Sequence, residues 1–167
     1  AGKLMIRIDK PKDENTSVPK LIVNGSVESK GNVEIFNETF LTIQGDGASL
    51  SAEGTLTVKG NPVIAVNNTG DGPAVQAGGN ITIKDTAAVD AVSADQEAAI
   101  QTGGIIGIGG TASVTAVNHG DGCAMGQAPN TEEYSGEVRI SASTSPGGRP
   151  GAEYKAEDIQ TYKYLKI

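Results

Sequence analysis

Three aspartates, each lying between two glycines, could bind a metal ion. Asp46, Asp71 and Asp121 sit in Gly-Asp-Gly triplets that fall in one column of a 25-residue repeat. If equivalent residues stack from one repeat to the next at roughly 5 Å, the column presents carboxylate and carbonyl oxygens, which suit Ca²⁺ better than a transition metal. The alternative is that each aspartate closes a tight turn through hydrogen bonds to its own backbone. Calcium is therefore an expected cofactor, with the turn as the rival explanation.

A second set of residues has the chemistry of carbohydrate recognition. Lys59 and Lys84 follow equivalent apolar runs one repeat apart, and Arg139 is expected on the same strand face. With Tyr134 they are candidate contacts to a polysaccharide, because sugars stack on aromatic rings and accept hydrogen bonds from polar and basic groups. We expect binding through a flat sheet face or through the loops at 126–135 and 141–152. A basic strip on a chain of net charge −7 favours an acidic glycan.

The single cysteine and the single histidine are expected to be inert. Cys123 shares a column with small apolar residues, which predicts a buried thiol. His119 follows an asparagine at a predicted corner, where a solvated turn residue is the simpler interpretation. Because His119 is the only histidine, no catalytic triad or zinc site can use a pair of histidines.

The elements that position these residues follow from the repeat. Steps of 25 residues separate Gly45, Gly70, Asp95 and Gly120. Short alternating apolar runs, punctuated by glycine at a fixed period, are typical of a solenoid whose turns stack on one another.

Each repeat contains three apolar runs, which predict three short strands. The first is 56–58, 81–83 and 106–108, the second is 64–66, 89–92 and 114–117, and the third is centred on Val75, Ile100 and Met125. The predicted fold is therefore all-β: a right-handed parallel β-helix with three strands in each roughly 25-residue rung. A βαβ fold would need crossover helices, and no segment has helical apolar spacing.

The chain is expected to form one domain with two distinct ends. Residues 1–30 do not follow the period and are predicted to be N-terminal cap strands, whereas 31–167 form the β-helix. A loop insertion near 126–135 interrupts the repeat, and a strand at 161–167 closes it. Lysines on that last strand discourage end-to-end pairing, which an open solenoid edge otherwise invites.

Charge and hydropathy limit the partners. Twenty acidic residues against 13 basic ones argue against nucleic acid, whose phosphates repel an acidic surface. No apolar run approaches the roughly 20 residues that cross a bilayer, so no membrane insertion is expected. Because the chain begins with Ala1 rather than methionine, we expect it to be trimmed, with any targeting segment outside it.

The segments 70–83, 104–110 and 162–167 together resemble a known family. They are similar to the Gly-rich right-handed β-helix repeats of secreted and cell-surface bacterial proteins, of carbohydrate-binding type. The resemblance implies an extracellular location, polysaccharide binding in some members and Ca²⁺ held between rungs in others. Asp95-Gln96-Glu97 departs from the Gly-Asp-Gly pattern and would interrupt a continuous calcium ladder.

Three function classes remain open from the sequence. The favoured one is a non-catalytic polysaccharide-binding module, and the alternative is a structural stalk, adhesin or filament subunit that self-associates end to end. The third is a β-helix polysaccharide lyase or hydrolase. A lyase needs a basic residue beside its carboxylate-bound calcium, and here the basic and acidic columns are expected at different corners.

Overall fold

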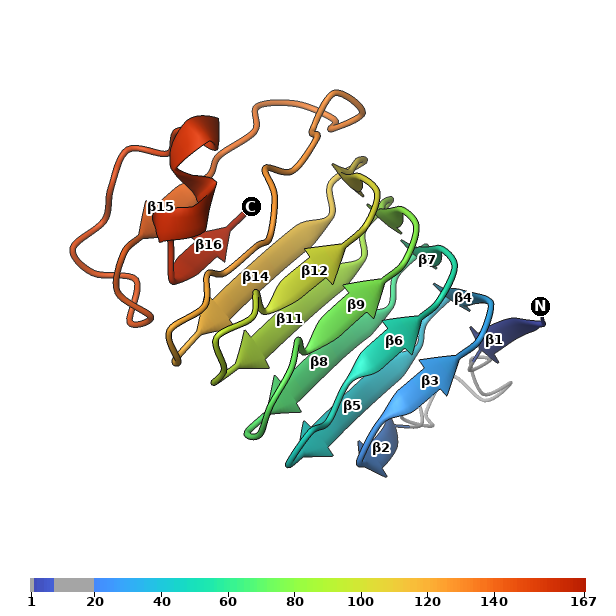
Figure 1. Ribbon diagram of the computed structural model, residues 1–167. Helices are drawn as coiled ribbons and strands as arrows, with labels where there is room; N and C mark the ends of the chain where they lie inside the picture. The colour runs from blue at the N-terminus through green and yellow to red at the C-terminus, as the bar shows by residue number, and fades with distance from the viewer. Residues whose placement is uncertain (1, 8–19) are drawn as a thin grey trace.

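The chain winds into a β-solenoid of about four turns, in which short parallel strands stack from turn to turn (Figure 1). The computed structural model describes residues 2–7 and 20–167. Strands make up 47% and helix 4%, so the molecule is nearly all-β, which confirms the predicted fold class.

Three sheets form the walls of the coil, one for each apolar run of the repeat. Sheet 1 consists of β1 (Lys3–Arg7), β4 (Asn32–Phe36), β7 (Leu56–Lys59), β10 (Ile81–Ile83) and β13 (Ile106–Ile108). Sheet 2 begins with β2 (Lys20–Asn24), β5 (Phe40–Gly45), β8 (Val63–Asn68), β11 (Ala88–Ser93) and β14 (Ser113–Asn118), and continues to β16 (Tyr164–Lys166) and β15 (Ser141–Ser143). Sheet 3 consists of β3 (Val27–Ser29), β6 (Leu50–Ala52), β9 (Val75–Ala77) and β12 (Ile100–Thr102).

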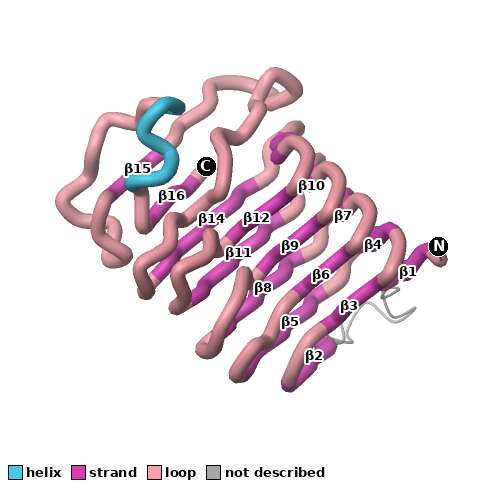
Figure 2. The backbone as a smooth tube through the Cα atoms, in the orientation of Figure 1, coloured by secondary structure: helices cyan, strands magenta, loops and turns pink. Residues whose placement is uncertain are grey.

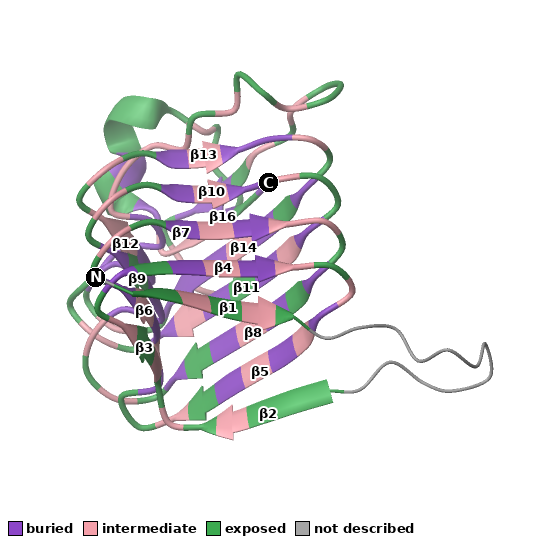
Figure 3. Ribbon diagram, turned by 90° about the vertical axis from the view of Figure 1, so that its right-hand side faces the viewer, coloured by how far each residue is buried: buried purple, intermediate pink, exposed green. Residues whose placement is uncertain are grey.

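Alternation along each strand decides which side chains form the core. In β10, Ile81 and Ile83 are buried inside the coil, whereas Thr82 between them is half-buried and lies on the outer side. Figure 3 shows such alternation of buried and less buried segments along the strands. The same pattern places Leu56 and Val58 of β7 inside. Val, Ile, Leu and Ala dominate the interior, because a narrow coil has room for small and branched side chains.

The register between turns is not uniform. From β7 to β10 and from β10 to β13 the paired residues are 25 apart, as in Ile81 with Ile106. Between β5 and β8, however, Phe40 pairs with Val63, so this step is 23 residues. Gly45 consequently lies opposite Asn68 rather than Gly70. The 25-residue spacing of the first two Gly-Asp-Gly triplets therefore does not correspond to strand register.

Buried polar residues close the corner between sheets 2 and 3. Asn68 donates from Nδ2 to the carbonyl oxygens of Asp71 and Gly72, at 3.0 and 2.9 Å, and accepts a hydrogen bond from Gly70 N. One turn on, Ser93 takes the equivalent position, and its buried hydroxyl has no partner among the described residues. Asn118 then repeats the motif by accepting from Gly120 N at 2.7 Å.

Strands of the segment predicted as N-terminal cap strands, residues 1–30, continue the three sheets of the coil. β1, β2 and β3 pair in parallel with β4, β5 and β6, respectively. Residues 1 and 8–19 of that segment lie outside the described residues. Leu21 points along an inward row yet is 42% exposed, because no further described strand covers this end.

The C-terminal segment, predicted to end in a closing strand at 161–167, covers the opposite end of the coil. β16 runs antiparallel between β14 and β15, and the short 3₁₀ helix η1 (Ala156–Thr161) precedes it (Figure 2). Ile159 and Leu165 bury their side chains against the last turn. Lys163 Nζ donates to the carbonyl oxygens of Gly120 and Gly122, at 2.6 and 2.7 Å, and so fastens the closing segment to the corner.

The alternation in β10 makes a direct prediction. Ile83→Asp places a carboxylate where the side chain is 1% exposed, and should cost several kcal/mol, on the order of the whole stability of a domain. Thr82→Asp, one residue away on the outward side, should fold normally. Circular dichroism and urea unfolding of the two variants would measure the difference. A folded Ile83→Asp beside an unfolded Thr82→Asp would mean that the inward face has been assigned to the wrong residues.

Candidate functional site

The two lysines predicted to contact a ligand share the outward side of sheet 1. Lys59 ends β7, and Lys84 follows β10 one turn later. Lys59 Nζ forms an ion pair with Glu34 of β4, which also pairs with Lys3 of β1. Hydrogen bonds from these two lysines hold the pKa of the Glu34 carboxyl below its ordinary value. Lys84 makes no ion pair with any described residue, so it is the member of this pair that a ligand could engage.

The other two predicted contacts lie elsewhere. Residues 136–140 form no strand, and Arg139 is 83% exposed and pairs with Glu137 at 3.2 Å. Tyr134 forms a bridge with Gly110 beyond the end of β13, and its half-buried side chain packs against the core. The structure therefore brings Lys59 and Lys84 together, but it does not bring Arg139 to their strand face.

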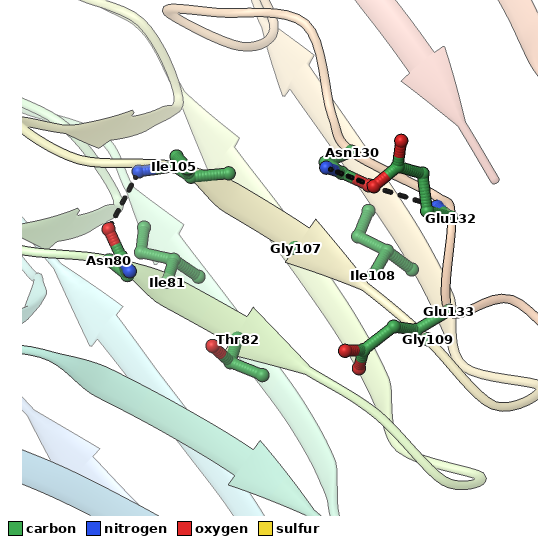
Figure 4. A pocket seen from close by; sticks show the side chains of 10 residues that line it. All are labelled: Asn80, Ile81, Thr82, Ile105, Gly107, Ile108, Gly109, Asn130, Glu132 and Glu133. Atoms are coloured by element: carbon green, nitrogen blue, oxygen red, sulfur yellow. Dashed lines mark hydrogen bonds between the residues drawn. The ribbon is translucent and has the colours of Figure 1, made fainter.

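A pocket of about 210 Å³ opens on the outer face of sheet 1, over its last two strands (Figure 4). Its floor includes the bare backbone at Gly107 of β13, and Thr82 of β10 lies beside it. The insertion predicted near 126–135 supplies Asn130, Glu132 and Glu133 on the other side. The pocket thus joins the two regions expected to bind a ligand, the sheet face and this loop.

Backbone contacts hold the polar side chains of the pocket in place. Asn80 Oδ1 accepts a hydrogen bond from Ile105 N at 3.0 Å, which leaves its Nδ2 group for a ligand. Asn130 pairs with β13 through its own backbone and accepts from Glu132 N at 2.9 Å. Ile105 adds an apolar wall that is 54% exposed. The arrangement offers several hydrogen-bonding groups around a small apolar surface, which is the chemistry that binds a sugar.

Sequence reasoning did not single out this pocket, although one signal was present. Thr57, Thr82 and Gly107 occupy the same outward row on three successive turns. Glycine at the third position removes a side chain where the repeat has threonine, and the missing side chain is what leaves the hollow. Asn130 and Glu132 could not be placed, because the insertion breaks the period that located every other residue.

The aspartate column is less regular than the 25-residue spacing suggests. Asp46 Oδ1 lies where a side chain on Gly70 would be, so its carboxylate meets the next corner at Gly70. Among residues 2–7 and 20–167, no group of three or more His, Cys, Asp and Glu side chains is placed to hold a metal ion. Calcium binding by Asp46, Asp71 and Asp121 would therefore need carbonyl oxygens as ligands as well, and it stays a prediction.

Asp95, at the turn that departs from the Gly-Asp-Gly pattern, has a structural role. Its Oδ2 atom accepts a hydrogen bond at 2.8 Å from the backbone N–H of Gly72 in the preceding turn. This bond, with others from the backbone of Gln96 and Glu97, lowers the pKa of the Asp95 carboxyl. The Asp95 carboxylate thus holds the backbone of its own turn and ties that corner to the preceding one.

The cysteine and the histidine behave as the sequence predicts. Cys123 is buried and lies 3.1 Å from the Met125 carbonyl oxygen, to which its thiol donates. Burial raises the pKa of the thiol, which keeps it protonated and unreactive. His119 is exposed in a corner.

The fold defines the chain as a β-solenoid, and comparison with known proteins does not narrow this class. No family model, curated protein or solved structure matches the chain. The resemblance to Gly-rich β-helix repeats therefore holds at the level of architecture. Within the described part of the chain, no helix has the length and apolar character needed to cross a bilayer.

The ion pairs of Glu34 predict how stability depends on pH. Because the folded-state pKa of Glu34 lies below the ordinary 4.5, its contribution is complete above that pH and is lost as the pH falls through the folded-state value. Glu34→Gln should lower the free energy of unfolding at pH 7 by up to about 1 kcal/mol. Urea unfolding at pH 7 and pH 3 should show the two proteins converging in acid. Glu137→Gln is the matched control, since its pair is fully solvated and should change little at either pH. A constant difference at both pH values would contradict the role of the Glu34 charge.

The calcium hypothesis predicts a thermal shift. Millimolar Ca²⁺ should raise the melting temperature by binding to the folded state alone, and Mg²⁺ should do less. Asp71→Asn should remove much of the shift, whereas Asp90→Asn, on the outer face of β11, should leave it intact. Identical melting curves with Ca²⁺ and with a chelator would leave the Gly-Asp-Gly corners as turns.

Proposed function

We propose that the chain is a non-catalytic module that binds a polysaccharide on the outer face of sheet 1. The observation that carries the proposal is the pocket over Gly107, which continues into the outward row of Thr82 and Thr57. A regular sheet face presents side chains at the spacing of its strands, so it can contact several units of a linear polymer without rearranging. We further propose that the protein acts outside the cell, at a bacterial surface.

We propose a non-catalytic role because the titratable groups with shifted pKa values do not gather at the pocket. The described groups with shifted pKa values are Glu34, Asp95, Cys123 and Tyr154, and each shift follows from an ion pair, a turn or burial. Perturbed groups at a catalytic site usually converge on one cleft. Glu34 lies in β4, whereas Asp95 and Cys123 lie in stacked corners between sheets 2 and 3, and the pocket over Gly107 is lined by none of the four.

The preference of the site for a ligand of a given charge depends on Lys84. The expected basic strip of Lys59, Lys84 and Arg139 is reduced, since Lys59 is paired with Glu34 and Arg139 with Glu137. Lys84 remains two residues beyond Thr82, on the same side of the sheet. We therefore propose that Lys84 gives the site its preference for an acidic glycan.

Affinity electrophoresis in gels containing polygalacturonate tests the proposal. The protein should be retarded, and added salt should reduce the retardation, because charge contacts are screened over about 10 Å at 0.1 M. Lys84→Ala should lose much of the retardation. Lys59→Ala is the matched control one turn away and should lose less, since its charge is already paired.

A structural role is the second candidate, and the N-terminal end favours it. Within the described residues, β1, β2 and β3 each have a neighbouring strand on one side only, which is the geometry that lets a solenoid stack on another chain. Unchanged mobility on all acidic and neutral polymers, together with a mass that grows with concentration in light scattering, would replace the binding module by a stalk or filament subunit.

A further inference from the structure

One glycine in sheet 1 has no steric reason to be there. Gly107 is the central residue of β13, and its φ is not in the left-handed region. A Cβ at this position would meet nothing nearer than the Ile81 carbonyl oxygen at 3.9 Å, which is ordinary van der Waals contact. Glycine within a strand weakens it, and often marks a place where a ligand approaches the backbone closely.

Gly109, two residues further along the chain, is more tightly enclosed than Gly107. A Cβ on Gly109 would lie 3.1 Å from Glu133 Cβ and 3.2 Å from the Glu133 carbonyl oxygen, so a side chain there would crowd the 126–135 insertion. On the two preceding turns the position of Gly107 is held by Thr57 and Thr82, which shows that the strand geometry accepts a β-branched residue. Packing would therefore allow a side chain at position 107, and the glycine leaves the space above the strand open.

The groups around this space indicate what fills it. Thr82 and Asn80 lie on one side, and Glu132 and Glu133 of the insertion lie on the other (Figure 4). The carboxylates accept hydrogen bonds from hydroxyl groups but repel another carboxylate. Ile105 provides an apolar surface for the C–H face of a ring. A ligand here needs several hydroxyl groups, one apolar face and no negative charge.

We infer that the hollow over Gly107 is a subsite for one neutral sugar residue of a polysaccharide chain. This inference rests on the proposed function and assigns the acidic and the neutral units of the ligand to different contacts. Lys84 contacts an acidic unit, and the hollow takes an uncharged one a short distance along the same strand face. The outer face of sheet 1 then has two subsites of opposite charge preference.

Filling the hollow tests the inference without disturbing the fold. Gly107→Thr restores the residue type of the two preceding turns, so its melting temperature should stay the same or rise. Affinity for a soluble neutral polymer, hydroxyethyl cellulose, should fall about tenfold, as expected when one or two hydrogen bonds are lost. Retardation by polygalacturonate should be retained, because Lys84 is untouched.

Two controls separate this inference from the proposed function. Lys84→Ala should show the reverse pattern, with loss on polygalacturonate and retention on hydroxyethyl cellulose. Thr42→Val, on the outer side of sheet 2, should bind both polymers like the natural sequence. If the protein binds polygalacturonate alone, or if Gly107→Thr binds the neutral polymer undiminished, the neutral subsite is overturned while the binding module stands. If neither polymer retards the protein, the proposed function itself is overturned.

Discussion

The close approach of successive turns is the constraint on which the rest of the molecule depends. Parallel strands stack through backbone hydrogen bonds along the axis, so each residue lies over its equivalent one turn before. At some corners this approach leaves no room for a side chain. A Cβ on Gly103 would lie 2.5 Å from the Gly78 carbonyl oxygen, and one on Gly120 would lie 2.5 Å from the carbonyl oxygens of Ala94 and Asp95. Glycine at these two corners and branched apolar residues on the walls both follow.

The strands of the repeat could be predicted from the sequence because alternation and period report directly on stacking. Register could not be predicted where corners differ in length. The corner from Asn68 to Val75 holds two more residues than the corner below it, from Gly45 to Leu50, so the step between turns is 23 residues before this corner and 25 after it. The antiparallel direction of β16 depends on contacts with β14 that no period encodes. The partner of Lys59 was missed for a similar reason, since Glu34 lies in a turn with its own spacing.

The candidate site shows how function can be built on such a scaffold with few changes. Every outward position of sheet 1 is supported by an inward neighbour that fixes its backbone, so a single substitution alters the surface and leaves the core intact. One side chain removed at Gly107 and one loop inserted at 126–135 create a pocket. Because the inserted loop is tied to β13 by backbone hydrogen bonds at Ile106 and Ile108, its polar groups have defined positions.

The placement of β16 ties the order of synthesis to the completion of the fold. Turns contact only their neighbours, so those near the amino end can assemble while the chain is still emerging from a ribosome. The edge of β14 must wait for residues 164–167, because they supply the strand that covers it. A nascent chain stalled before that point would present an unpaired strand edge, and such edges recruit other chains. The edge of β14 therefore stays open until both η1 and β16 have been made.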